Sequence, residues 1–318
     1  MRVLITGVTG FVGSHLAEYC LSLGCEVYGT RRWRSPMDNI TGIADQIQLL
    51  ECDLLDESST FQAISTSQPE YIFHLAAQSY VPSSFVAPRA TLATNILGTL
   101  NLLEAVRRAR IEPGIHICSS SEVYGQVEPD EVPITEQNPM RPQSPYAVSK
   151  VGEDLLAYQY FRSYGMKTIR TRAFTHTGPR RGSVFVASAF AKQISQVEKG
   201  LSPPVVRVGN LNSIRTWLDV RDIVRAYWMC VERCPAGEVY NIGGTTTKSV
   251  GEMLEFLISQ SSSREDIEVR EDPALMRPSD VTLQIPSTEK FSKATGWSPK
   301  IPFTQTMRDL LDYWREKI

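Results

Sequence analysis

The segment that most constrains this chain is its first thirteen residues. Val3–Ile5 is an apolar, β-branched run of strand length, and Thr6-Gly7-Val8-Thr9-Gly10-Phe11-Val12-Gly13 follows it before an amphipathic stretch of helical pattern. Glycines between a strand and a helix let the backbone turn sharply, and the free N–H groups at the helix start attract an anion. Because strand, loop and helix occur in this order, the segment predicts a site for the pyrophosphate of a dinucleotide.

Short β-branched runs alternate with amphipathic stretches through the first half of the chain, which is typical of βαβ units and a parallel sheet. The expected strands are Arg2–Thr6, Glu26–Gly29, Ile47–Glu51, Tyr71–Leu75, Gly114–Ser119 and Lys167–Arg172. The expected helices are Gly13–Leu23, Ser58–Gln68, Ala87–Arg108 and Pro145–Tyr164. We therefore expect an α/β fold of the Rossmann type, with a doubly wound parallel sheet and a smaller, mixed α/β C-terminal lobe.

Loop signals increase after Phe174, before the pattern of a helix (Asp219–Cys234) and a strand (Glu238–Ile242) returns. We expect residues 1–173 to form the nucleotide-binding domain, with residues 216–243 returning to it. Residues 174–215 and 244–318 should form a substrate-binding lobe, with helices at Ser249–Ser259 and Phe303–Lys317.

The composition excludes several classes of partner. A formal net charge of −2 predicts no nucleic-acid or membrane partner. The apolar runs are too short to span a bilayer, and Met1 leads directly into the first strand, so we expect no targeting peptide. The six cysteines lack metal-ligand or disulfide-framework spacing, which predicts no metal site and a reducing cytoplasm.

The end of the second strand distinguishes the two nicotinamide cofactors. Tyr28-Gly29-Thr30-Arg31-Arg32 has no carboxylate to bond the ribose 2′-hydroxyl of NAD, whereas two guanidiniums suit a 2′-phosphate. The pattern favours NADP over NAD, with a solvated basic turn as the alternative interpretation. Asp53, after the third strand, is placed to accept a bond from the adenine amino group.

A candidate proton-transfer pair lies at the start of the helix expected at 145–164. Ser144 suits a cap and Pro145 the first helical position, so Tyr146 and Lys150 lie one turn apart on one face. A phenol ionises near pH ~10, and the neighbouring ammonium and the helix start favour the phenolate. Tyr146 is therefore a usable proton donor or acceptor at a substrate hydroxyl.

With these features in place, the chain resembles an extended short-chain dehydrogenase/reductase of the nucleotide-sugar epimerase/dehydratase family over essentially its whole length. The matching pieces are the glycine loop, His74-Leu75-Ala76-Ala77-Gln78, Asn95 with Gly98-Thr99, Ser119–Gly125, Tyr146 with Lys150, and Arg172-Ala173-Phe174. The resemblance implies that Ser120 bonds the reacting C4 oxygen, that Tyr146 moves its proton, and that Lys150 also holds the nicotinamide ribose.

Glu122, two residues after Ser120, distinguishes the reactions of this family. The 4,6-dehydratases have a glutamate there, because a carboxylate must remove the C5 proton while water leaves C6. A simple 4-epimerase or 4-reductase needs no such base. The alternative is an acidic loop residue without that role, since some reductases of similar sequence also carry an acid there.

The substrate class is also implied by resemblance. Pro179–Val186 and Val208–Arg215 resemble segments of GDP-mannose 4,6-dehydratases, whereas Ala189–Ile194, Asp219–Val224 and Thr295–Pro302 look closer to GDP-4-keto-6-deoxymannose reductases. Both use GDP-sugars. We expect an NADP-dependent 4,6-dehydratase acting on GDP-mannose, with the NADPH-dependent reductase as the runner-up and a 4-epimerase behind it. Retention of Ser120, Tyr146 and Lys150 argues against a non-catalytic NADP-binding regulator.

The resemblance implies two sets of contacts and an assembly. Cofactor contacts are expected at Gly7, Thr9, Gly10, Phe11, Val12, Gly13, Arg31, Arg32, Asp53, Leu54, Leu75, Ala76, Ala77, Gln78, Asn95, Tyr146, Lys150, Phe174 and His176. Substrate contacts are expected at Ser79, Ser84, Ser120, Glu122, Thr175, Arg181, Val186, Lys192, Arg215 and Arg277. Thr175 replaces the usual asparagine, which puts the contacts at that point in doubt. Residues 87–108 and 145–164 should form a homodimer through a four-helix bundle, with a tetramer as the alternative.

Overall fold

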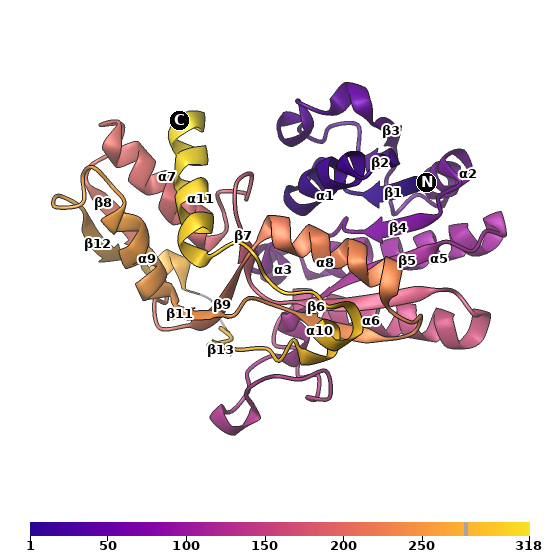
Figure 1. Cartoon of the computed structure of the whole chain (residues 1–318). Coiled ribbons are helices and arrows are strands. Elements are labelled where there is room, and N and C mark those ends of the chain that lie inside the picture. The colour runs from indigo at the N-terminus through magenta and orange to yellow at the C-terminus, as the bar shows by residue number, and fades with distance from the viewer. Residues whose placement is uncertain (277–278) are drawn as a thin grey trace.

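A seven-stranded parallel sheet is the centre of the computed structural model, which describes residues 1–276 and 279–318 (Figure 1). The strand order is β10-β6-β5-β4-β1-β2-β3. The strands are β1 (Arg2–Thr6), β2 (Glu26–Arg31), β3 (Gln48–Glu51), β4 (Tyr71–His74), β5 (Gly114–Ser120), β6 (Thr168–Ala173) and β10 (Val239–Ile242). The predicted Rossmann-type fold is confirmed, and every strand predicted for this sheet forms, with small shifts at the ends.

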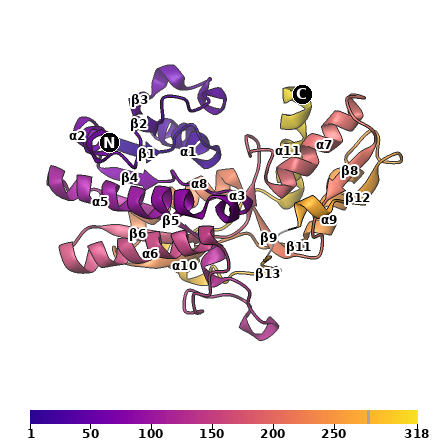
Figure 2. The same ribbon diagram turned by 180° about the vertical axis from the view of Figure 1, so that it is seen from behind.

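Helices cover both faces of the sheet, as buried parallel strands require (Figure 2). Successive side chains of a strand point to opposite faces. Val3 and Ile5 of β1 share a core with α1 (Phe11–Ser22) and α8 (Val220–Arg233), whereas Leu4 packs on the other side. The helices on that side are α2 (Glu57–Ser67), α5 (Gly98–Ala109) and α6 (Pro145–Tyr164).

The helix predicted over residues 87–108 forms over residues 88–109, but it contains a π-helical turn. It is divided into α4 (Pro88–Leu92), a π-helical turn at Ala93–Leu97, and α5, and a separate helix α3 (Val81–Val86) precedes it. Asn95, which is fully buried, lies in the π-helical turn. Its amide oxygen accepts the Gln78 N–H at 2.8 Å, and its amide nitrogen donates to Ser149 Oγ at 2.8 Å. These contacts with distant segments, which periodicity does not encode, accompany the interruption.

The remaining elements form a smaller lobe beside the carboxyl ends of the central strands (Figure 1). Its core lies between α7 (Val186–Glu198), α9 (Val250–Ser259) and α11 (Phe303–Lys317). Two small sheets complete it: β8 (Val205–Val208) pairs with β12 (Glu268–Glu271), and β9 (Ile214–Asp219) joins β7 (His176–Thr177), β11 (Thr246–Ser249) and β13 (Leu283–Gln284). A short α10 (Glu289–Thr295) packs against β10.

The chain returns to the central sheet through β9 and α8. Asp219 ends β9 and caps α8, because its carboxylate accepts the Arg221 N–H at 2.8 Å. The predicted helices at 249–259 and 303–317 are confirmed, whereas α7 and α10 were not predicted. Within the described residues, no helix combines the length and apolar character that crossing a bilayer requires.

Candidate active site

The candidate site lies where the carboxyl ends of β1, β4 and β5 meet. β1 has β2 on one side and β4 on the other, so the strand order reverses at this point. Ligands of open parallel sheets bind in the crevice at such a reversal. The glycine loop follows β1, Leu75–Gln78 follow β4, and Ser120 is the last residue of β5.

The glycine loop is too closely packed for side chains at two of its positions. Gly7 has φ +70°, and a Cβ there would lie 3.0 Å from Ala76 Cα. A Cβ on Gly13 would lie 2.3 Å from the Gly7 carbonyl oxygen. α1 begins after Gly10 without a cap from any described side chain, so its first N–H groups can meet an anion. The loop therefore fits the pyrophosphate of a dinucleotide.

Thr6 joins the two loops of the expected cofactor site. Its hydroxyl accepts the N–H groups of Leu75 at 3.0 Å and Ala76 at 3.1 Å. The same hydroxyl lies 3.0 Å from Nδ1 of His74, whose Nε2 lies 3.0 Å from the Thr99 hydroxyl. Burial lowers the pKa of His74 to about 3, so this histidine is a neutral packing residue at physiological pH.

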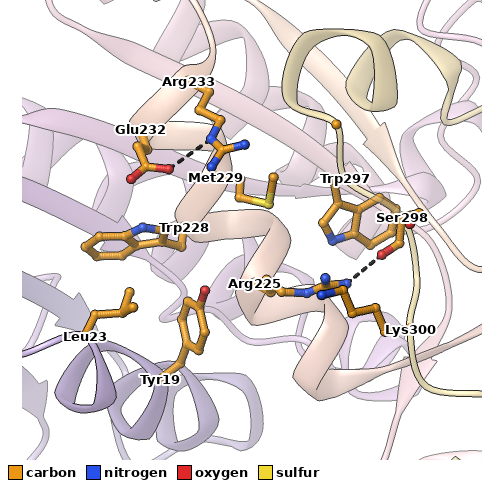
Figure 3. A pocket seen from close by; sticks show the side chains of 11 residues that line it. Tyr19, Leu23, Arg225, Trp228, Met229, Glu232, Arg233, Trp297, Ser298 and Lys300 are labelled. Carbon is orange, nitrogen blue, oxygen red and sulfur yellow. Dashed lines mark hydrogen bonds and ion pairs between the residues drawn. The ribbon is translucent and has the colours of Figure 1, made fainter.

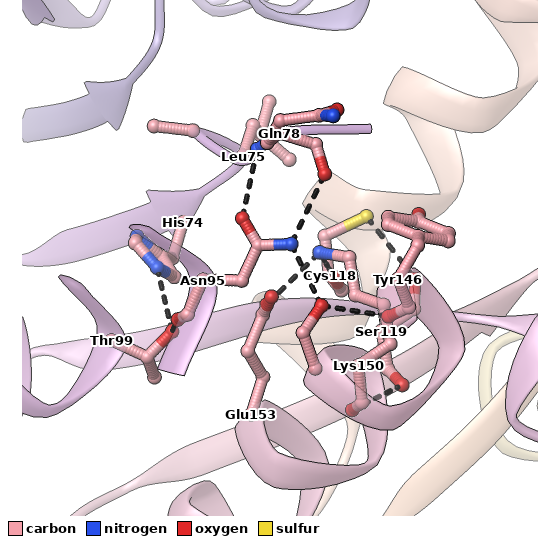
Figure 4. Close-up of polar contacts among 12 residues, drawn as sticks. His74, Leu75, Gln78, Asn95, Thr99, Cys118, Ser119, Tyr146, Lys150 and Glu153 are labelled. Carbon is pink, nitrogen blue, oxygen red and sulfur yellow. Dashed lines mark hydrogen bonds and ion pairs between the residues drawn. The ribbon is translucent and has the colours of Figure 1, made fainter. Parts of the chain in front are cut away.

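Tyr146 and Lys150, predicted as catalytic, lie at the start of α6 (Figure 4). Ser120, predicted to act with them, is near Tyr146 at the end of β5. Ser144 caps the helix, since its hydroxyl accepts the Ala147 N–H at 3.0 Å. The Ser120 hydroxyl is close enough to the Tyr146 phenol to lower the pKa of that phenol slightly. Nζ of Lys150 lies 5.9 Å from the centre of the Tyr146 ring. A phenol, a hydroxyl and an ammonium thus meet at the end of β5.

Burial, not the neighbouring charge, dominates the ionisation of Tyr146. Burial raises the pKa of the Tyr146 phenol above its ordinary value, and the Lys150 ammonium lowers it only in part. The sequence predicted that nearby positive charge would favour the phenolate. Lys150 does act in this direction, but burial outweighs it. In the protein without ligands, the phenol keeps its proton at neutral pH.

Lys150 has an acidic partner that sequence reasoning missed. Its Nζ donates to the Cys118 carbonyl at 2.8 Å and to Oε2 of Glu153 at 2.9 Å (Figure 4). The Glu153 side chain is 1% exposed. The available signal was spacing, because residues three apart on a helix are neighbours on its surface.

Glu122 follows Ser120 in a 3-10 turn, Ser121–Tyr124. The Glu122 N–H donates to the Ser120 hydroxyl at 3.2 Å, and the Glu122 side chain is partly exposed. Gln284 of β13 donates its side-chain amide to Oε1 of Glu122 at 3.4 Å. Sequence reasoning missed Gln284, since nothing local marks a contact across 162 positions.

The expected adenosine end is basic and open to solvent. Arg31 ends β2 and donates to the carbonyl of Trp33 at 3.0 Å, while the N–H of Arg32 donates to Ser35 Oγ at 3.2 Å. The indole of Trp33 is 64% exposed. Asp53 is exposed, and its carboxylate accepts the backbone N–H two residues on at 3.0 Å. Both guanidiniums and the carboxylate are therefore accessible to a nucleotide.

A cation and two rings lie beside the glycine loop. The Arg181 guanidinium lies 3.5 Å from the centre of the Phe185 ring and 4.9 Å from that of Phe11. Phe11 also stacks on His176, with ring centres 6.1 Å apart and planes at 7°. Burial lowers the pKa of Arg181 to about 10 and that of His176 to about 4. Arg181 is thus a poorly hydrated cation suited to a phosphate.

Several other predicted contact residues have partners within the protein. Ser84 is fully buried and donates to a carbonyl of its own helix, Phe174 packs in the core, and Lys192 lies 5.5 Å from the Trp314 ring. Arg215 donates to two backbone carbonyls. Ser79 and Val186 are exposed, and Leu54 is buried. The main-chain carbonyl of Thr175 accepts the N–H of Leu218. Arg277 lies outside the described residues.

A separate pocket of about 380 Å³ lies between α1, α8 and residues 296–300 (Figure 3). Its walls include Tyr19, Trp228 and Trp297, and none of the predicted catalytic residues lines it. Arg225 there donates to the Ser298 carbonyl at 2.6 Å, and Arg233 contacts the adjacent Glu232. These cations are engaged within the protein, so we assign no ligand to this pocket.

Comparison with known proteins identifies the family. The profile described as GDP-mannose 4,6 dehydratase matches residues 4–310. GDP-6-deoxy-D-mannose reductase of Pseudomonas aeruginosa is 32% identical over 317 residues, covering 100% of this chain and 98% of the relative. GDP-mannose 4,6-dehydratase of Yersinia enterocolitica is 33% identical over 348 residues, covering 98% and 92%.

Solved structures agree with this assignment. The structure of RMD from Pseudomonas aeruginosa in complex with NADPH superposes with a TM-score of 0.86 at 31% identity, and each chain is covered completely. The UDP-glucose 4-epimerase of Thermus thermophilus, in complex with NAD, gives 0.87 at 30% identity, again over both whole chains. The resemblance noted in the sequence is therefore confirmed, and this chain belongs to the GDP-mannose 4,6-dehydratase family within the nucleotide-sugar epimerases and dehydratases.

Proposed function

We propose that this chain is an NADP-dependent 4,6-dehydratase that converts GDP-mannose to GDP-4-keto-6-deoxymannose. Its relatives of that name cover nearly the whole chain, and the glycine loop fits a dinucleotide. The guanidiniums of Arg31, which is half-buried, and Arg32, which is exposed, support NADP over NAD, because they suit a 2′-phosphate. When bound, NADP would supply a carrier for the hydride that leaves C4 and returns to C6.

The residues of the site account for the proton movements of this reaction. Tyr146 accepts the proton of the C4 hydroxyl while Ser120 holds the oxygen, and Lys150 stabilises the phenolate that begins the step. The C4 ketone acidifies the C5 proton. Glu122 takes that proton and passes it to the C6 hydroxyl, which leaves as water.

The observation that carries the dehydratase assignment is the position of Glu122. Its main chain is bonded to Ser120 and its carboxylate is oriented by Gln284, so an acid stands beside the reacting hydroxyl. A 4-keto reductase does not need a second base. Arg181, between the rings of Phe11 and Phe185, is our proposed contact for the diphosphate of the substrate.

Reduction of GDP-4-keto-6-deoxymannose with NADPH is the second candidate. The Pseudomonas reductase matches this chain almost end to end. The raised pKa of Tyr146 also suits a proton donor to a reduced carbonyl oxygen.

Purified protein incubated with GDP-mannose and NADP⁺, without added reductant, separates the two reactions. Formation of a 4-keto-6-deoxy sugar nucleotide supports the dehydratase. Conversion of the keto sugar alone, with stoichiometric NADPH consumption, would identify the reductase. No conversion of either substrate would sink both proposals.

We further propose a cytoplasmic homodimer formed through α5 and α6, with a tetramer as the alternative. Apolar side chains of α6 and of the turn before α5 are exposed: Leu97 is 48% exposed, Val148 44%, Leu155 51% and Tyr158 42%. Exposed apolar surface of this kind is typical of a helix–helix interface. Sedimentation of Leu155→Lys should give a monomer where the unaltered chain gives a dimer.

We also propose a division into a cofactor domain (1–173, with 216–243) and a substrate-binding lobe (174–215 and 244–318). The cofactor loops belong to the central sheet, and Gln284 and Arg181 come from the other segments. Limited proteolysis with and without NADP should show protection confined to the first set of residues.

A further inference from the structure

A buried ion pair lies directly behind Tyr146 on α6. Lys150 Nζ and Glu153 Oε2 are 2.9 Å apart, and the two side chains are 5% and 1% exposed. The second carboxylate oxygen of Glu153 is buried and has no hydrogen-bond partner among the described residues. This incomplete pairing costs free energy, because a buried carboxylate normally has every oxygen satisfied.

The ion pair with Glu153 restrains the Lys150 ammonium, which lowers the pKa of the Tyr146 phenol. An ammonium has three N–H donors, and those of Lys150 include one to Glu153 and one to the Cys118 carbonyl at 2.8 Å. Glu153 therefore fixes where Nζ lies. The negative charge of Glu153 also partly cancels the effect of the Lys150 ammonium on the Tyr146 phenol. This effect is large because charges interact more strongly in the protein interior than in water.

We infer that Glu153 is a positioning residue that sets the pH at which Tyr146 exchanges its proton, by offsetting the charge of Lys150. The inference rests on the role proposed above for Tyr146, and it holds for either direction of hydride transfer. Ionised Glu153 makes the phenol harder to deprotonate, which is the direction found for the Glu153 contribution to the Tyr146 pKa.

The other titratable groups facing this trio on β4, β5 and α8 are neutral at physiological pH. From β4 and β5, burial lowers the pKa values of His74 and His116 to about 3. Burial raises the pKa of the Cys118 thiol on β5 and that of the Tyr227 phenol on α8. At physiological pH, none of these four groups carries a charge that offsets Lys150.

The remaining charged neighbours are fixed. Asp154, next to Glu153 on α6, is held by Arg170 at 2.8 Å and by Arg172 at 2.9 Å. Arg181, before α7, is a cation and acts in the same direction as Lys150. Glu153 is thus the carboxylate of α6 that contacts Lys150, at 2.9 Å, and burial raises its own pKa to about 7. It is ionised over the range in which a phenol titrates.

The test is a titration of Tyr146 itself, without substrate or cofactor. Tyrosinate absorbance is recorded against pH for the wild type and for Glu153→Gln, Glu153→Met and Glu153→Asp, each minus its Tyr146→Phe counterpart. We expect both neutral variants to lower the Tyr146 midpoint by about one pH unit, as loss of a nearby charge does. Glu153→Asp keeps the negative charge, so its Tyr146 midpoint should lie close to that of the wild type. Either neutral variant suffices if the other does not fold.

Glu255→Gln is the matched control, because it removes the same charge from an exposed position on α9. Its midpoint should equal that of the wild type. If a folded neutral variant loses activity or thermal stability but keeps the wild-type midpoint, Glu153 only supports the helix and the inference is overturned. A midpoint for Glu153→Asp equal to that of Glu153→Gln overturns it as well.

The pH dependence of kcat/KM gives the second readout. The limb that reports Tyr146 should move to lower pH by the same amount in Glu153→Gln. A shifted titration in a protein that converts neither substrate would defeat the proposed function and leave this inference standing. If the protein converts substrate but the Tyr146 midpoint is the same in Glu153→Gln as in the wild type, the proposed function stands and this inference is overturned.

Discussion

The side-chain amide of Gln284 donates to the carboxylate of Glu122 at 3.4 Å, across 162 positions of the chain. Glu122 follows the central sheet, whereas Gln284 belongs to a short strand of the C-terminal lobe. The base proposed for C5 is therefore oriented by a residue from the other side of the site.

Glu122→Gln should abolish dehydration and leave cofactor binding intact. Removal of a positioned base costs about 10²–10⁴-fold in rate, so formation of the keto sugar should fall by that amount. Product is measured by chromatography, and NADP affinity by calorimetry. Glu128→Gln, on an exposed residue nearby, should be indistinguishable from wild type. Full dehydration by Glu122→Gln would refute the role assigned to Glu122.

Gly13→Ala should destabilise the protein through the glycine loop. The added Cβ would lie 2.3 Å from the Gly7 carbonyl oxygen, so the backbone must shift. Such overpacking costs about 1–3 kcal/mol of unfolding free energy. Gly42→Ala is the control, because a Cβ there meets nothing within 4 Å. Urea denaturation of both variants, with and without NADP, measures the difference. Equal stability would show that the loop yields easily.

Replacing Arg31 and Arg32 together by alanine should weaken NADP but not NAD. A charge-assisted bond contributes about 1.5–3 kcal/mol, so we expect a loss of roughly 10–100-fold in NADP affinity. Fluorescence titration of both cofactors gives the ratio. Arg34→Ala is the control, since that guanidinium stacks on Trp33 at 4.8 Å. The same loss from Arg34→Ala would indicate diffuse attraction in place of a 2′-phosphate site.

Two buried histidines should make the protein less stable in mild acid. Burial lowers the pKa values of His74 and His116 from 6.5 to about 3. Between these pH values, both histidines are protonated in the unfolded chain but remain neutral in the folded protein. Each contributes stability that is complete above pH 6.5 and declines by about 1.4 kcal/mol per pH unit toward pH 3. Glu153 opposes them, because its raised pKa stabilises the protein as the pH falls through 7.

His116→Gln isolates one of these contributions. Glutamine can keep a bond to Thr171, which lies 2.8 Å from the histidine Nε2, but it does not titrate. The unfolding free energy of this variant, measured between pH 6.5 and 5, should decline less steeply than that of the wild type. Parallel curves for the two proteins would contradict the assignment.

The sequence was most informative where the signals are local. Ser144 and Pro145 mark the start of α6, and the helix spans Pro145–Tyr164 as predicted. The three glycines place the first loop because strand, turn and helix are contiguous. The acid at Glu153 was visible in the sequence, but its burial against Lys150 depends on how deeply α6 packs.

What the sequence did not yield depends on contacts between distant segments. Apolar periodicity through 87–108 suggested one helix, and it carries no trace of the bonds that Asn95 makes to Gln78 and Ser149. Likewise, the amphipathic pattern gives no hint that Gln284 reaches Glu122. The balance at Tyr146 was misjudged for the same reason, because burial is a property of the packed protein.

The central sheet takes its last strand late in the chain. β10 pairs with β6, although α7, β8, β9 and α8 lie between them in the chain. During synthesis on the ribosome, β6 must therefore remain an unpaired edge while the intervening residues emerge, and such edges are where chains associate wrongly. A fragment ending at residue 215 should aggregate on release, whereas one ending at residue 243 carries every strand of the sheet. The order in which this protein is made thus exposes a surface that the finished molecule conceals.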